Sequence, residues 1–222
     1  MKIISAFDVV GPEMIGPSSS HTAGALKIAQ LARNLAGSGI VKVRFVLYGS
    51  FAKTYHGHGT DKALTAGIMG FSANDKRIRE AERLAREAGI EVSFVSDTED
   101  TPIHPNTVDV VMSMENGTSM TVTGISVGGG KAYIVKINGE DISLSGEYCT
   151  LFVHQKDSPG VMAHITTAFR DTNLNIAAMR LFRTKKGQDA YSVIESDDMI
   201  PEEVVKRIMV NPDIYIAKII TL

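Results

Sequence analysis

The stretch VDVVMSMENGTSMTVTGISVGGGKAYIVKINGE, residues 108–140, decides the fold of the first part of the chain. It holds three short runs rich in β-branched residues, separated by glycine-containing turns at 115–117 and 128–130 and closed by Asn138-Gly139. An Asn-Gly pair next to such a run is the strongest short signal for a β-hairpin. The stretch therefore predicts an antiparallel sheet over residues 108–144. Its triple glycine is interpreted as a wide hairpin turn, with a ligand-binding turn as the alternative.

Helical and strand patterns alternate upstream of this sheet. Residues 23–36 place Ile28, Leu31 and Leu35 on one face at helical spacing, which predicts an amphipathic helix. The other elements expected here are a strand at 41–48, a short helix, a second helix that begins near Asp61 and is capped by Thr60 or Asp61, a helix at 74–89 and a strand at 90–95. Together with the hairpins they predict an N-terminal α/β domain with an antiparallel sheet.

A new pattern begins after residue 146. The elements expected there are a strand at 148–155, a helix at 161–172, strands at 174–183 and 190–196, a helix at 201–210 and a strand at 213–221. This βαββαβ order is that of a ferredoxin-like sandwich. The fold class is therefore predicted as α+β, with one domain at 1–146 and a second at 147–222.

The composition excludes several classes of protein. The 222 residues carry a net charge of -2 and a pI of about 6.3, which argues against a nucleic-acid partner. No stretch reaches the ~20 apolar residues that cross a bilayer, and Asp8 interrupts the first apolar run, so neither a membrane span nor a secretory signal is expected. These features predict a cytoplasmic location.

The chain has a single cysteine, Cys149. An iron–sulfur cluster is held by several thiolates, so any cluster must belong to a partner chain, with Cys149 as at most one extra ligand. Because free cysteine is commonly buried, a buried small residue is the simpler interpretation of Cys149.

The stretch Gly16-Pro17-Ser18-Ser19-Ser20-His21-Thr22 carries the strongest chemical signal. One hydroxyl suffices to cap the helix that follows, so three serines and a histidine leave donors over for a bound anion at the helix N-terminus. The imidazole of His21 has an ordinary pKa of roughly 6.5, which suits a proton carrier. We interpret the stretch as an active-site loop; a polar turn with an ordinary cap is the alternative.

Four of the six histidines fall in predicted loops of the first domain: His21, His56, His58 and His104. One interpretation is a zinc site, in which His56 and His58 join another imidazole. The other is a site that grips a small polar substrate while a partner chain supplies the metal.

Several separated motifs support the second interpretation. FDVVGPEMIGPSSSHTAG at 7–24, GHGTDKAL at 57–64 and HPNT at 104–107 resemble the β subunits of the iron–sulfur-dependent bacterial L-serine dehydratases. In that family an α chain carries a 4Fe–4S cluster whose open iron acts as a Lewis acid on the serine hydroxyl. The resemblance implies a lyase of amino-acid degradation and gluconeogenesis that converts L-serine to pyruvate and ammonia with its α subunit.

The chemistry implied by this resemblance assigns roles to particular residues. Donors must hold the substrate carboxylate, and a base must face the α carbon. The expected catalytic residues are His21, His104 and Asn106, and the expected substrate-binding residues are Ser18, Ser19, Ser20, Thr22, His58 and Asp61. The group that takes the α proton is left open.

The second domain resembles the ACT family of amino-acid-sensing modules through DSPGVMAHIT at 157–166 and NLNIAAMRL at 173–181. In that family the ligand lies between the first strand–helix turn of one copy and a neighbouring copy. By position, the resemblance implies a regulatory ligand site at Asp157, Gly160, Val161 and Asn175 and a homo-oligomer formed through this domain. A purely structural dimerisation domain is the alternative.

Three other functions remain to be compared. A pyridoxal-phosphate dehydratase would need a Schiff-base lysine, and Lys27, Lys53 and Lys62 lie near the loops, but nothing resembles that class and no such cofactor is expected. A non-catalytic subunit that senses serine through the second domain would have no use for the Ser-His stretch. Kinship with the anion-binding domain of some phosphoglycerate dehydrogenases would make residues 18–22 an allosteric anion site.

Overall fold

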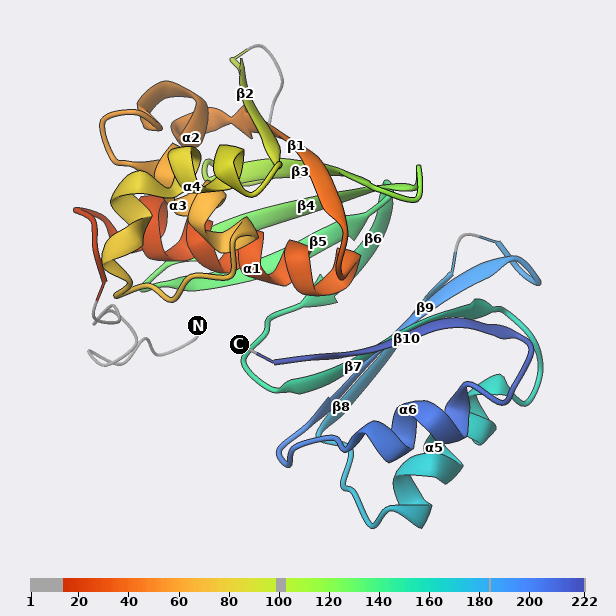
Figure 1. The fold of residues 1–222 in the computed structure, drawn as a ribbon. Helices are drawn as coiled ribbons and strands as arrows, with labels where there is room; N and C mark the ends of the chain where they lie inside the picture. The colour runs from red at the N-terminus through yellow and green to blue at the C-terminus, as the bar shows by residue number, and fades with distance from the viewer. Residues whose placement is uncertain (1–13, 99–102, 184, 222) are drawn as a thin grey trace. The chain divides into compact units, whose positions relative to one another are not determined.

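The computed structural model describes residues 14–98, 103–183 and 185–221, so residues 7–13 of the first family-like motif lie outside the described part. The chain separates into two compact units, Met1–Gly139 and Glu140–Leu222 (Figure 1). The chain forms two sheets, and the first of them continues past the unit boundary to Leu144. In the described ranges, no helix is both long and apolar enough to cross a membrane.

The first sheet has six strands in the order β2-β1-β3-β4-β5-β6. The strands are β1 (Ile40–Tyr48), β2 (Glu91–Asp97), β3 (Thr107–Met114), β4 (Ser119–Gly128), β5 (Lys131–Ile137) and β6 (Glu140–Leu144). Strand β2 runs parallel to β1, whereas β1, β3, β4 and β5 are antiparallel neighbours. Asn138 and Gly139 both have positive φ, 50° and 87°, as a two-residue hairpin turn requires. The predicted antiparallel sheet is confirmed.

Helices cover this sheet (Figure 1). They are a π-helical turn η2 (Ser19–Gly24), α1 (Ala25–Ala36), α2 (Gly49–Thr54), α3 (Thr60–Ile68), a 3-10 turn η3 (Lys76–Glu80) and α4 (Ala81–Glu87). Helix α1 packs against β4 and β5, and α3 packs against α1. Gly67 permits that helix contact, because a methyl group there would lie 2.5 Å from the Leu26 carbonyl oxygen and 2.6 Å from Ala29 Cβ.

Three helix starts differ from the prediction. The helix expected at 74–89 is a 3-10 turn, η3, followed by α4 from Ala81. The first helix begins with a wide π turn at Ser19, so most of the expected active-site loop is helical. Helix α3 has Gly59 as its N-cap, in the left-handed conformation with φ 67° and without a side-chain cap. Neither Thr60 nor Asp61 caps it, because a glycine reaches this conformation without steric cost and the Asp61 carboxylate pairs elsewhere.

The second unit has the predicted βαββαβ order. Its elements are β7 (Cys149–Lys156), α5 (Val161–Asp171), β8 (Ala178–Arg183), β9 (Asp189–Ser196), α6 (Glu202–Ile208) and β10 (Ile214–Ile220), with strand order β10-β7-β9-β8. Both helices lie on one face of this sheet (Figure 1). Leu151, Ile165 and Ile194 are fully buried between the helices and the sheet. The α+β class and the ferredoxin-like second domain are confirmed.

Candidate functional site

The serines and His21 lie at the start of the first helix. Ser18 is the N-cap, and its hydroxyl oxygen accepts a hydrogen bond from the His21 backbone N–H at 3.1 Å. The turn is π-helical from Ser19 and continues into α1, so the positive end of a long helix faces these side chains. Half-buried hydroxyls at a helix N-terminus form an environment that favours an anion.

The imidazole of His21 is fixed from several sides. Its Nε2 lies 3.0 Å from Ser50 Oγ, and its Nδ1 lies 3.4 Å from Ser18 Oγ and 3.5 Å from Ser20 Oγ. The ring meets Phe51 edge-on, with 5.3 Å between ring centroids, and faces the His58 ring at 4.8 Å. His21 is therefore held in one orientation, as a proton carrier must be.

Burial lowers the pKa of His21 below its ordinary value of 6.5, and the neighbouring His58 lowers it further. Both effects disfavour the protonated ring. His21 is therefore neutral near pH 7. Because its folded-state pKa lies below its unfolded value, protonation of the unfolded chain removes stability as the pH falls through about 6.5.

Replacing His58 with asparagine is expected to raise the pKa of His21 toward 6.5, because the neighbouring imidazole that lowers this pKa and part of the burial are lost. The measurement is an NMR titration of the His21 ring protons in this chain, assigned with a His21→Ala variant. His56→Asn is the matched control, since that imidazole pairs with Asp61 and does not contribute to the shift. A His21 pKa unchanged by His58→Asn would contradict the proximity of the two rings.

Thr22 and His58 join the first helix to the segment before α3. Thr22 is buried and donates its hydroxyl proton to the His58 carbonyl oxygen at 3.2 Å, so it positions that segment. His58 Nδ1 lies 3.3 Å from the Thr54 carbonyl oxygen, which can only accept. Neutral His58 thus carries its proton on Nδ1 and leaves Nε2 as an acceptor or base.

Asp61, which the sequence placed at a helix start and near the substrate, bonds to the His56 side chain. Its carboxylate is 6% exposed and contacts His56 Nδ1 at 2.8 Å and the Lys62 backbone N–H at 2.8 Å. The His56 side chain is 74% exposed. Asp61 therefore orients His56 and stabilises the start of α3, and both of its oxygens are already bonded.

His104 and Asn106 lie in the segment before β3. The backbone N–H of Asn106 donates to His104 Nδ1 at 3.1 Å, so neutral His104 carries its proton on Nε2 and is a hydrogen-bond donor there. The Asn106 side chain donates to the Ser126 carbonyl oxygen at 3.2 Å. This pair is thus fixed by β4.

Two serines that the sequence analysis did not single out bring these segments together. The Ser50 backbone N–H donates to the Pro105 carbonyl oxygen at 2.6 Å, while its hydroxyl contacts His21. Ser126 donates to the Ser20 carbonyl oxygen at 2.9 Å and, through its own carbonyl, holds Asn106. The residues at 18–22 and 104–106 are therefore tied to each other on two sides.

This arrangement suits a small anionic substrate. It combines hydroxyl donors, a neutral imidazole at His21, a donor at His104 Nε2 and an acceptor at His58 Nε2. Within the described ranges, no group of three or more His, Cys, Asp or Glu side chains is placed to hold a metal ion. The zinc interpretation at His56 and His58 therefore finds no third ligand of this kind in those ranges.

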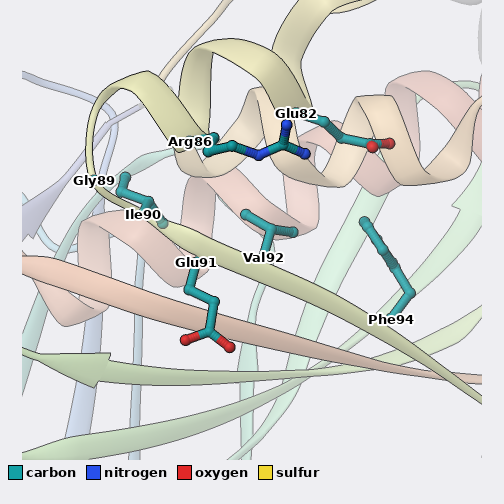
Figure 2. A pocket seen from close by; sticks show the side chains of 7 residues that line it. All are labelled: Glu82, Arg86, Gly89, Ile90, Glu91, Val92 and Phe94. Atoms are coloured by element: carbon teal, nitrogen blue, oxygen red, sulfur yellow. The ribbon is translucent and has the colours of Figure 1, made fainter.

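A cavity of ≈ 390 Å³ between α4 and β2 lies apart from these side chains (Figure 2). Its lining residues are Glu82, Arg86, Gly89, Ile90, Glu91, Val92 and Phe94. None of them is an expected site residue. The hydrogen bonds, not this cavity, identify the candidate site.

The expected regulatory residues of the second unit lie in two places. Asp157 accepts hydrogen bonds from the Gly187 N–H at 3.0 Å and from Arg183 at 3.2 Å, and these donors lower the pKa of its carboxyl. Gly160, with φ 89°, caps α5, which begins at the buried Val161. The Asn175 carbonyl oxygen accepts from Ser196, a residue paired with Cys149 at the far end of β7. Within one chain, Asn175 and Asp157 therefore lie near opposite ends of β7, about 20 Å apart along the strand.

Cys149 is half-buried, not fully buried as expected, because it packs against the edge of the second unit's core. Its sulfur accepts a hydrogen bond from the Ile200 backbone N–H at 3.2 Å.

Comparison with known proteins agrees with this architecture. The model of the "Serine dehydratase beta chain" family matches residues 5–136, and that of the "ACT domain" family matches residues 150–213. A probable L-serine dehydratase, beta chain, of Bacillus subtilis is 40% identical over 96% of both chains. The L-serine dehydratase, beta chain, of Peptoniphilus asaccharolyticus is 40% identical over 92% of both chains. A D-3-phosphoglycerate dehydrogenase of Bacillus subtilis is 28% identical over 72% of this chain and 30% of its own length. The chain therefore belongs to the serine dehydratase beta chain family and carries an ACT domain.

Proposed function

We propose that this chain is the substrate-gripping half of an L-serine dehydratase that works with a separate α chain. The observation that carries the proposal is the joining of the 18–22 turn to the 104–106 segment through Ser50 and Ser126. Relatives that match nearly the whole chain are named as beta chains of L-serine dehydratases. We also propose that the first domain ends at residue 146, because β6, which ends at Leu144, belongs to the first sheet.

The reaction removes the α proton and the β hydroxyl of L-serine as water. The 2-aminoacrylate product tautomerises to the imine, which water hydrolyses to pyruvate and ammonia. The substrate carboxylate needs donors, and the hydroxyls of Ser18, Ser19 and Ser20 at the helix N-terminus supply them. His21, His104 and Asn106 handle and orient protons, and the acceptor at His58 Nε2 contacts the substrate from the other side.

We further propose that the α chain holds a 4Fe–4S cluster. This chain does not fit the cluster, because its one thiol, Cys149, packs in the second unit and bonds to Ile200. The chemistry assigned to the residues here is therefore limited to binding, orientation and proton handling. Activation of the leaving hydroxide is assigned to the partner α chain.

For the ACT domain we propose an amino-acid site at Asp157, Gly160 and Val161, completed by Asn175 from a neighbouring copy. The support is the separation of Asn175 from the β7–α5 turn within one chain. Such a site forms only in a homo-oligomer.

One alternative has specific support. Similarity to a D-3-phosphoglycerate dehydrogenase favours an anion-binding regulatory role for residues 18–22. That role gives binding without turnover, so it predicts full activity when His21 is replaced.

The test is anaerobic pyruvate formation from L-serine by this chain, by its α partner and by their mixture. We expect activity in the mixture only, because donors and Lewis acid lie on different chains. Equal activity of the α partner alone would refute the proposal and leave this chain a regulator.

A further inference from the structure

The environment of Ser50 points to a function that no motif indicated. Gly49, with φ 55°, turns the chain sharply from the end of β1 into α2, and Ser50 follows it half-buried. Its backbone N–H is already bonded to the Pro105 carbonyl oxygen. Among the described residues, its hydroxyl has one hydrogen-bond partner, His21 Nε2 at 3.0 Å.

Which nitrogen of the His21 ring carries the proton depends on the hydrogen-bonding groups on its two sides. On the Nδ1 side lie two hydroxyl oxygens, at 3.4 Å and 3.5 Å, and the Ser18 oxygen already accepts the His21 backbone N–H. Both oxygens have lone pairs that can share an Nδ1–H. On the other side the Ser50 hydroxyl has no competing acceptor among the described residues, so its proton is available to Nε2.

We propose that Ser50 is the positioning residue of the site: it donates to His21 Nε2 and so holds the imidazole as the Nδ1–H tautomer. The hydrogen bond made at one ring nitrogen selects the protonation of the other. The Nδ1–H is then directed toward Ser18 and Ser20, where the substrate carboxylate binds in the proposed function on which this inference rests.

Two measurements test the proposal, and the first needs no partner chain. In ¹⁵N-labelled chain, the imidazole nitrogen shifts distinguish the two tautomers of His21. We expect the Nδ1–H form in the natural protein and a mixture of tautomers in Ser50→Ala. An Nε2–H form in the natural protein, or signals unchanged by Ser50→Ala, would overturn the proposal.

The second measurement is turnover of the anaerobic mixture with the α chain. Ser50→Ala is expected to lower kcat by ~10–100-fold, the usual cost of losing a residue that orients a functional imidazole. The KM for L-serine should change much less, and Ser50→Thr should restore most of kcat because it keeps the hydroxyl.

The matched control is Ser96→Ala. Ser96 donates its hydroxyl proton to the Ala52 carbonyl oxygen at 3.0 Å, so this variant also removes a bond to α2 but does not touch His21. Equal losses of kcat in both alanine variants would reduce Ser50 to a structural role. Full activity of Ser50→Ala would also reject the inference, and an inactive His21→Ala beside it would leave the proposed function intact.

Discussion

Replacing His21 with alanine is expected to lower kcat of the dehydratase mixture by about 10²–10⁴-fold, the usual contribution of a positioned proton carrier. The imidazole is held by Ser50 at one nitrogen and by two serines near the other, and alanine makes none of these contacts. The free energy of unfolding should change by only ~1 kcal/mol, because the ring is half-buried. Anaerobic pyruvate formation and urea unfolding measure the two effects.

The control for this variant is His154→Ala. His154 lies on the second unit, where its ring stacks on Tyr191 and bonds to Asp189 at 3.0 Å. Loss of this imidazole should leave kcat at the natural level. Equal activity of His21→Ala and His154→Ala would favour the regulatory anion site over a catalytic one.

Gly24→Ala should disrupt the site by a collision with Ser126 on β4. A methyl group at Gly24 would overlap the Ser126 hydroxyl and lie 2.8 Å from Ser126 Cβ, and that hydroxyl holds the Ser20 carbonyl. Overpacking of this kind typically costs ~1–3 kcal/mol of stability. Displacement of Ser126 also shifts the 18–22 turn and Asn106, so we expect kcat to fall with stability. Urea unfolding and turnover of the same preparation measure both.

A control variant distinguishes the collision at Gly24 from the effect of any glycine-to-alanine change on stability. Gly57→Ala adds a methyl group 3.7 Å from the Thr54 carbonyl oxygen, an ordinary contact, and should change stability by less than about 0.5 kcal/mol. Adding Ser126→Gly to Gly24→Ala makes room for the methyl group. The double variant should then be more stable than the sum of the single changes, and strict additivity would contradict the contact.

The sequence predicted the parts of the fold that local chemistry controls. The hairpin at Asn138 formed where two residues with positive φ were needed, and the buried face of α1 contains Ile28, Leu31 and Leu35 as expected. The βαββαβ order followed from periodicity and turn residues. The start of the first helix was misplaced: the helix begins with a π turn at Ser19, directly after the Ser18 N-cap.

The candidate site was predicted less completely, because hydrogen bonds between distant segments create it. Nothing local distinguishes Ser50 or Ser126 from an ordinary strand or turn serine, yet they lie 29 and 106 residues from their partners in the 18–22 turn. Asp61, which was expected to bind substrate, pairs in the structure with His56, five residues earlier. That spacing was visible in the sequence, and a histidine five residues before an aspartate was the available signal.

The central claim is that the 18–22 turn holds the substrate carboxylate within a site shared by two chains. A crystal structure of the anaerobic complex with L-alanine, which keeps the carboxylate and amine but has no β hydroxyl to lose, tests it most directly. We predict the carboxylate within hydrogen-bond distance of the Ser18, Ser19 or Ser20 hydroxyls, beside the His21 ring. A carboxylate bound entirely by α-chain residues, with the turn empty, would contradict the claim.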